Sequence, residues 1–201
     1  YYFRFFAFIQ LNIWQPKIIV VTGSNGKTST LHLLESQLQD QARYSHFANS
    51  AFGIPFDILG INRTKFSKAE WLKLFFIAPI KAFKKPFKQS IYVAEADCDR
   101  PHEGRFLSKL LKPSITIWLS SARTHSYNFD NLVKTVKFKT VEDAIAYEYG
   151  HHIENTSELV IVNSDNPLID KQLRRTTAKV IKVSQISQLQ DYQVTSRELT
   201  L

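Results

Sequence analysis

The chain has 201 residues, of which 44% are hydrophobic and 22% are charged, which is the composition of a globular domain with a sizeable core. Cys98 is the only cysteine, so an internal disulfide and a cysteine metal cluster are both excluded, and a reducing, cytoplasmic location is expected. The formal net charge is +8, and the basic residues responsible for it are considered below.

The chain opens on an apolar segment, residues 1–9, which is too short to span a bilayer and has no small-residue cleavage site of a signal peptide. We expect residues 1–16 to be a lead-in segment, with the end of a helix in it. Because the sequence starts at Tyr1 and contains no methionine, we expect it to be a piece of a longer chain.

Short β-branched runs bounded by polar or turn residues predict five strands along the chain. Helical segments alternate with them, which predicts an α/β fold with a mainly parallel sheet flanked by helices. The predicted strands are Lys17–Thr22, Ser90–Ala94, Ser114–Leu119, Leu159–Asn163 and Ala178–Val183.

Apolar residues at near-helical spacing predict four helices between these strands. In the second of them, Pro79 is expected to kink or end the helix. We expect residues 17–185 to form the main domain and residues 186–201 to be a polar linker toward another domain. The predicted helices are Thr28–Gln41, Lys68–Phe83, Glu103–Leu111 and Val141–Glu154.

The segment Gly23–Thr30, GSNGKTST, follows the first predicted strand directly. A buried strand, a glycine-bearing turn and a Gly-Lys-Thr sequence at the start of a helix are typical of a phosphate-binding loop. Backbone N–H groups would contact phosphate oxygens, Lys27 would reach the β- and γ-phosphates, and Thr28 would bind Mg²⁺. The alternative is an incidental polar turn before a helix. The residues expected to hold the nucleotide are Gly23, Ser24, Asn25, Gly26, Lys27, Thr28 and Ser29.

This loop departs from the usual pattern, which has a glycine five positions before the glycine of the Gly-Lys pair. Here that position is Val21. The short form, Gly-x-x-Gly-Lys-Thr-Ser, belongs to fewer families, so the departure makes an ordinary kinase or GTPase less attractive.

Lysines and aromatic residues alternate between residues 71 and 88, giving a basic amphipathic surface. A solvated helix face is the simplest interpretation. A face that contacts a membrane surface or an acidic substrate is the second interpretation, and a face that binds nucleic acid is the least favoured.

Four further stretches resemble a known family when they are taken together with the phosphate loop. They are Asn49–Pro55 (NSAFGIP), Val93–Asp97 (VAEAD), Asp99–Gly104 (DRPHEG) and Asn163–Pro167 (NSDNP). From about Lys17 to Val183, the chain resembles the central ATP-binding domain of the Mur ligases, the ATP-dependent amide ligases of peptidoglycan precursor synthesis. The branch that adds a dipeptide to the UDP-muramoyl-tripeptide is the nearest.

The resemblance implies that a substrate carboxylate is activated by ATP as an acyl phosphate and that an amine then displaces the phosphate. It implies ATP and Mg²⁺ as cofactors, with Lys27, Glu95 and His125 in catalysis and with Thr28, Glu95 and His125 at the metal. A carboxylate at a strand end suits Mg²⁺, although Glu95 could instead be a solvated strand-end residue. The alternative for His125 is a structural role, or simple exposure on a loop.

Two other motifs carry positions that the resemblance places near the substrates. Asn163 and Asp165 match family positions near the adenine and ribose, and an Asx turn closing the strand is compatible with that role. Asn49 and Ser50 match a loop that faces the substrate in the family, or they simply belong to a turn.

The sequence also departs from the family. A carbamylated lysine is usual in the segment after the histidine, but Tyr149 stands at that position, and a phenol cannot form such a carbamate. Lys139 or Glu148 could substitute for it. In addition, Leu119 and Ser120 replace the usual Thr-Asn pair before His125.

We therefore predict the ATP-binding domain of a Mur-like ligase, inactive in ligation by itself. The expected partners are a nucleotide-sugar peptide or another carboxylate substrate, an amine co-substrate, and N- and C-terminal domains outside this sequence. The alternatives are a folylpolyglutamate- or cyanophycin-type ligase and a catalytically degenerate nucleotide-binding module.

Overall fold

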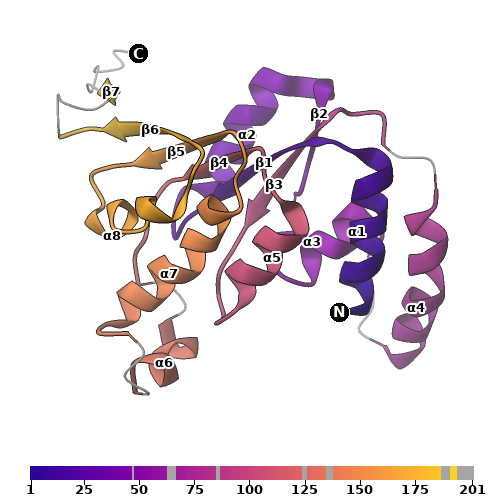
Figure 1. The fold of residues 1–201 in the computed structure, drawn as a ribbon. Helices are drawn as coiled ribbons and strands as arrows, with labels where there is room; N and C mark the ends of the chain where they lie inside the picture. The colour runs from indigo at the N-terminus through magenta and orange to yellow at the C-terminus, as the bar shows by residue number, and fades with distance from the viewer. Residues whose placement is uncertain are drawn as a thin grey trace, which may run out of the picture.

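The computed structural model describes residues 1–46, 48–62, 67–84, 87–123, 126–134, 138–186 and 191–193. Within these residues, seven strands form one sheet in the order β2-β3-β1-β4-β5-β6-β7, and every neighbouring pair is parallel (Figure 1). The strands are β1 (Lys17–Thr22), β2 (Ala42–Tyr44), β3 (Ile91–Ala96), β4 (Ile115–Trp118), β5 (Leu159–Asn163), β6 (Lys179–Ser184) and β7 (Tyr192–Gln193).

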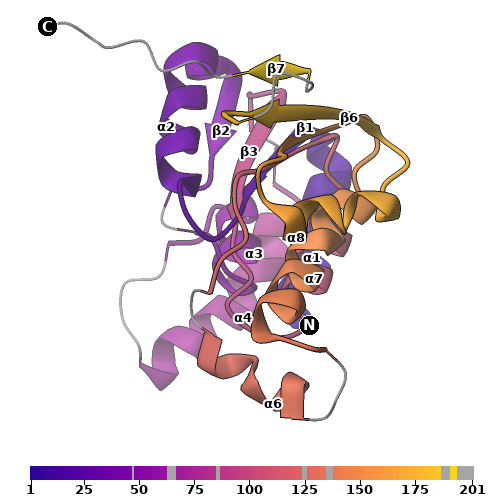
Figure 2. The ribbon, with the colours of Figure 1, turned by 90° about the vertical axis from the view of Figure 1, so that its left-hand side faces the viewer.

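Helices cover both faces of this sheet, and most of them lie on one face. Figure 2 shows α2 on one side of the sheet and α1, α7 and α8 on the other. The helices are α1 (Tyr2–Trp14), α2 (Lys27–Leu38), α3 (Gly53–Ile58), α4 (Lys68–Ala82), α5 (Glu103–Leu111), α6 (Asp130–Lys134), α7 (Val141–Glu154) and α8 (Pro167–Asp170), with single 3₁₀ turns at Gln39–Gln41, Ser126–Asn128 and Leu173–Arg175.

The two layers of core follow from the alternation of side chains along the central strand β1. Ile18 and Val20 belong to the large core cluster that includes residues of α1, α3, α4 and α5. Ile19 and Val21 point to the opposite face, where they pack with Leu31 of α2. Since successive side chains of a strand point to opposite faces, a continuous apolar strand is buried between two layers of helices.

The fold class predicted from the sequence is confirmed, and the five predicted strands and four predicted helices all occur, with small shifts at their ends. The strand around Glu95 runs two residues further than predicted, to Ala96. The short strands β2 and β7 were not predicted, because three and two residues give too little periodicity to be detected.

Pro79 does not end its helix, because α4 continues past it to Ala82. A proline leaves the carbonyl four residues earlier without its helical N–H partner. In this structure that carbonyl, Phe75 O, accepts a hydrogen bond from the hydroxyl of Tyr2 at 2.7 Å. The neighbouring helix α1 therefore replaces the missing bond.

Both ends of the described chain contribute to this fold. Phe3, Ala7, Leu11 and Trp14 of α1 are buried in the large core cluster. Near the other end, β7 pairs with β6. The division at residues 16 and 185 remains a prediction, but α1 and β7 pack or pair with the central part.

Candidate functional site: a phosphate loop at the carboxyl edge of the sheet

The phosphate loop lies at the point where the chain order of the sheet reverses. From β1 the chain first builds β2 and β3 on one side and later β4 to β6 on the other. In open parallel sheets, ligands bind outside the carboxyl ends of the strands at such a point. The loop after β1 therefore has the position expected of a binding site.

Backbone contacts with the segment after β4 hold the loop in place. Ser24 N donates to Ser120 O at 3.1 Å, and Ser24 Oγ bonds the backbone of Ala122 in both directions. Ser120 Oγ accepts from Asn25 N at 2.9 Å. Gly23 has φ +129°, and a Cβ there would stand 2.8 Å from Ser120 N, so only glycine fits this close approach.

The loop leads into α2 with its donors exposed. Gly26, at φ +84°, is the N-cap of α2, and no side chain among the described residues caps this helix start. The first N–H groups of an α-helix have no intrahelical acceptor, and the helix dipole favours an anion there. Asn25, Gly26, Thr28 and Ser29 are all exposed. The helix start can therefore accept a phosphate from the solvent side.

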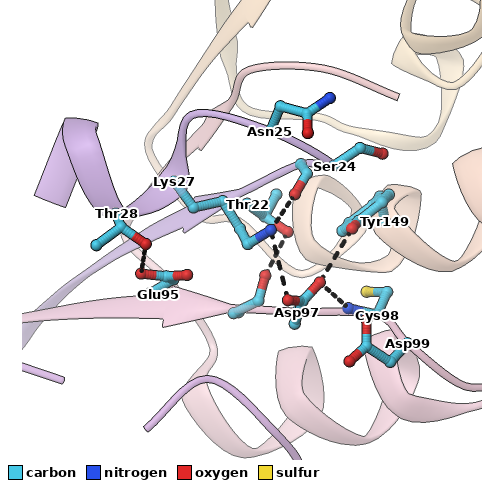
Figure 3. A network of polar contacts seen from close by, with 12 residues as sticks. Thr22, Ser24, Asn25, Lys27, Thr28, Glu95, Asp97, Cys98, Asp99 and Tyr149 are labelled. Carbon is cyan, nitrogen blue, oxygen red and sulfur yellow. Dashed lines mark hydrogen bonds and ion pairs between the residues drawn. The ribbon is translucent and has the colours of Figure 1, made fainter. Parts of the chain in front are cut away.

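Two side chains of the loop reach two carboxylates at the end of β3 (Figure 3). Thr28 Oγ1 donates to Glu95 Oε2 at 3.0 Å. Lys27 is buried; its Nζ donates to Gly23 O at 2.6 Å and lies 3.4 Å from Asp97 Oδ2. The structure thus brings the predicted residues Lys27, Thr28 and Glu95 together.

Asp97 was not predicted as a site residue, although it lies in the motif Val93–Asp97. Its Oδ1 accepts from the Tyr149 hydroxyl at 3.1 Å and from Cys98 N at 3.0 Å. Burial, together with nearby Cys98 and Asp97, raises the pKa of Tyr149 well above its ordinary value, so the phenol stays protonated and donates. The two-residue spacing from Glu95 is the sequence signal that could have identified Asp97.

Of the three residues considered for the place of the family lysine, only Tyr149 is shown in contact with this network. Lys139 is exposed before α7 and lines a different cavity with Asp143 and Lys171. Glu148 is buried and lines a cavity of about 310 Å³ beside Arg105 and Lys109. His125 lies outside the described residues.

The Asn163–Pro167 motif forms the turn that the sequence allowed. Asp165 N donates to Asn163 Oδ1 at 3.0 Å, which is an Asx turn. Asp165 in turn accepts from Ser184 Oγ and from Gln185 N, so it ties β5 to the end of β6. Asn163 and Asp165 line a cavity of about 300 Å³ with Trp118 and Leu119, and Leu119 also lies against Gly26.

A larger cavity of about 650 Å³ lies on the other side of the site. Ser50 lines it together with the basic residues Arg4, Arg100, Arg105 and Lys109. Glu103 organises its wall, because Oε1 accepts from Ala51 N at 2.8 Å and Oε2 from Asp99 N at 3.1 Å. Asn49 instead uses its carbonyl to accept from Asp97 N at 2.8 Å.

Comparison with solved structures gives the same fold. The chain is similar to MurF from Acinetobacter baumannii (TM-score 0.64, 16% identity, 95% of this chain and 35% of that chain). It is also similar to MurF ligase from Thermotoga maritima in complex with ADP (TM-score 0.64, 18% identity, 92% of this chain and 36% of that chain). The chain thus spans about a third of the length of these proteins.

The sequence comparisons are consistent with that likeness. No curated protein matches the chain in sequence. The family model described as Mur ligase middle domain matches residues 21–200. This match covers the phosphate loop, Glu95 and Asp97 and the Asn163–Pro167 turn, and the chain therefore belongs to the Mur ligase middle-domain family.

Proposed function

We propose that this chain is the ATP-binding part of an amide ligase that activates a substrate carboxylate as an acyl phosphate for attack by an amine, in peptidoglycan precursor synthesis. The observation that carries the proposal is the phosphate loop Gly23–Thr28 placed against Glu95 at the carboxyl edge of the sheet. The family membership supports the reaction class.

The residues present fit a nucleoside triphosphate with Mg²⁺. The close packing of Gly23 on Ser120 and the uncapped start of α2 form a cradle of backbone donors. Thr28 and Glu95 offer the hard oxygen ligands that Mg²⁺ prefers. The bound ion would neutralise charge on the transferred phosphoryl group. The apolar cavity beside Asn163 is suited to a nucleobase.

Lys27 is the residue that we expect to move a short way when a nucleotide binds. Its ammonium contacts Gly23 O and Asp97, and a phosphate in the loop would replace the carbonyl as its partner. Asp97 and Tyr149 keep the lysine at the loop, because the phenol fixes the carboxylate that faces it. We assign both as positioning residues.

The substrate that supplies the carboxylate is expected on the side of the 650 Å³ cavity. Its arginines and lysine suit an anionic molecule such as a nucleotide-sugar peptide. Domains outside this chain would complete the binding site for this substrate and bind the amine co-substrate. We place the reaction in the cytoplasm.

A catalytically degenerate nucleotide-binding module is the second candidate, and the observation that favours it is Tyr149 itself. A neutral phenol occupies the position where the family resemblance implies an anionic metal ligand. A polyglutamate- or cyanophycin-type ligase would share the nucleotide site and differ only in the flanking domains.

The ligase proposal is tested with the natural full-length protein by measuring phosphate release from ATP. A nucleotide-sugar peptide and a D-alanyl-D-alanine dipeptide are supplied together and then one at a time. Release that needs both substrates supports the ligase. ATP binding without any substrate-dependent release would support the degenerate module instead.

We further propose that α4 contacts an anionic lipid surface. Leu72, Phe76, Ile80 and Phe83 recur at helical spacing, and each is more than 60% exposed, so they form one apolar stripe. Exposed Lys68, Lys73 and Lys84 supply the complementary charge. No helix among the described residues is long and apolar enough to cross a membrane.

This contact is tested by sedimentation with phosphatidylcholine vesicles that contain or lack phosphatidylserine. We expect binding only to the anionic vesicles, and its loss in Phe76→Ser. Leu33→Ser on α2 is the matched control, because Leu33 is 67% exposed and α2 packs on the face of the sheet opposite to the core cluster that includes α4. Equal losses in both variants would contradict the assignment of α4.

A further inference from the structure

Three side chains that play no part in the phosphate site gather beside α2. His32 and Glu35 lie one turn apart on this helix, and His46 follows β2. His32 Nδ1 is 3.2 Å from Glu35 Oε2, and His46 Nε2 is 3.0 Å from Glu35 Oε1. The candidate ligand atoms of the three residues all lie within 4.8 Å of one another. One carboxylate is thus shared by two imidazoles.

Two imidazole nitrogens and a carboxylate oxygen are ligands typical of zinc. Zinc ligands at about 2.1 Å in a tetrahedral arrangement stand roughly 3.4 Å apart, so modest side-chain shifts would bring these atoms to a common centre. Mg²⁺ prefers oxygen ligands in an octahedral arrangement and would be disfavoured here. The cluster therefore differs in ligand chemistry from Thr28 and Glu95.

A second histidine-glutamate pair of the same spacing shows what distinguishes this cluster. His151 Nδ1 lies 2.9 Å from Glu154 Oε2 on α7. There the third partner is Arg175, whose Nη2 lies 2.9 Å from His151 Nδ1 and 2.6 Å from Glu154 Oε2. The guanidinium of Arg175, a permanent cation, therefore already occupies the position beside His151 and Glu154. At His32 and Glu35 the third partner is another imidazole, which can bind a metal ion.

We propose that His32, Glu35 and His46 bind a divalent transition-metal ion of the zinc class, with water in the remaining position. The ion would join α2 to the segment after β2. That segment is linked to the phosphate site, since Ser45 Oγ accepts from Glu95 N at 2.8 Å. Lys27 and Thr28 lie at the start of α2. A bound metal ion would therefore hold α2 and the segment after β2 together, and both of these contact the phosphate site.

The test is isothermal titration of the metal-free chain with ZnCl₂, with MgCl₂ titrated separately. We expect one zinc ion per chain, no heat of binding from magnesium at this site, and at least a tenfold loss of zinc affinity in His46→Ala and in Glu35→Gln. Glu154→Gln is the matched control and should keep the affinity of the wild type. Circular dichroism without zinc checks that each variant is folded.

Lys27→Ala separates this site from the nucleotide site, because it should keep zinc binding while losing ATP binding. Absence of zinc binding by the wild type would overturn the proposal. So would equal affinity in wild type, His46→Ala and Glu35→Gln, since the zinc would then bind elsewhere. The visible spectrum of the Co²⁺-substituted chain gives an independent check, because it should change in His46→Ala and not in Glu154→Gln.

Discussion

The end of β3 carries two carboxylates two residues apart, and their surroundings differ. Glu95 accepts a hydrogen bond from Thr28, whose side chain belongs to the exposed start of α2. Asp97, which follows β3, is contacted by Lys27, the Tyr149 hydroxyl and Cys98 N. Glu95 therefore has a neutral hydroxyl as its partner and can take a metal cation, whereas Asp97 already has a protein cation and two donors.

The residues next to Asp97 include two buried ionisable groups. Cys98 and His152 are buried, and Cys98 Sγ lies 3.8 Å from His152 Nε2. Burial raises the pKa of the Cys98 thiol well above its ordinary value and lowers that of His152 to about 3, so both groups are neutral. The difference teaches that Glu95 is available for ligand chemistry, whereas Asp97 and the buried groups next to it are structural support.

The largest effect is expected at Lys27, which lies between the phosphate loop and Asp97. In Lys27→Ala, ATP loses a charge-assisted contact to its phosphates, and such contacts contribute about 1.5–3 kcal/mol each. We expect ATP affinity in the presence of Mg²⁺ to fall by about a hundredfold or more in calorimetric titration. Unchanged ATP affinity in Lys27→Ala would contradict the assignment of Gly23–Thr28 as a phosphate loop.

The next effect tests buried His152 through the pH dependence of stability. The unfolded chain binds a proton on His152 near pH 6.5, whereas the folded chain does so only near pH 3. Between these values the unfolded state holds the extra proton, so the free energy of unfolding falls as the pH is lowered through this window. At pH 4.5 this loss is about 3 kcal/mol relative to pH 7.

Urea denaturation of wild type and His152→Gln at both pH values isolates this contribution from those of other groups. The wild type should lose about 2–3 kcal/mol more than the variant on acidification. Parallel pH profiles for the two proteins would mean that His152 is accessible to protons in the folded state.

The smallest effect is expected at Tyr149. Tyr149→Phe removes one hydrogen bond to Asp97, and the free energy of unfolding should fall by about 1 kcal/mol in urea denaturation. ATP affinity should change by less than about fivefold, because the phenol acts only through Asp97. A loss as large as that of Lys27→Ala would instead show direct participation of the phenol in binding.

The sequence predicted much of the sheet because its central strands are continuous apolar runs, as Lys17–Thr22 shows. It did not predict β2 or the contact that replaces the helical hydrogen bond lost at Pro79. The first is too short for periodicity, and the second depends on the hydroxyl of Tyr2, which is 73 residues away from Phe75 in the chain. Contacts between residues so far apart in the chain cannot be predicted from a local sequence pattern.

Within the site, the loop residues were predicted because their spacing is itself the signal. Asp97 and the support of the loop by Ser120 were missed, since both roles depend on which strands are neighbours. Tyr149 was read only as a departure from the family. Its hydrogen bond to Asp97 became apparent when α7 and β3 were placed in space.

The account is tested most directly by the Mg²⁺ dependence of ATP affinity in two matched variants, Glu95→Gln and Asp97→Asn. Calorimetric titrations with and without Mg²⁺ are compared with the wild type. We predict that Mg²⁺ raises ATP affinity at least tenfold in the wild type and in Asp97→Asn, and that this gain is lost in Glu95→Gln. Loss of the Mg²⁺ effect in Asp97→Asn with its retention in Glu95→Gln would contradict the roles assigned to the two carboxylates.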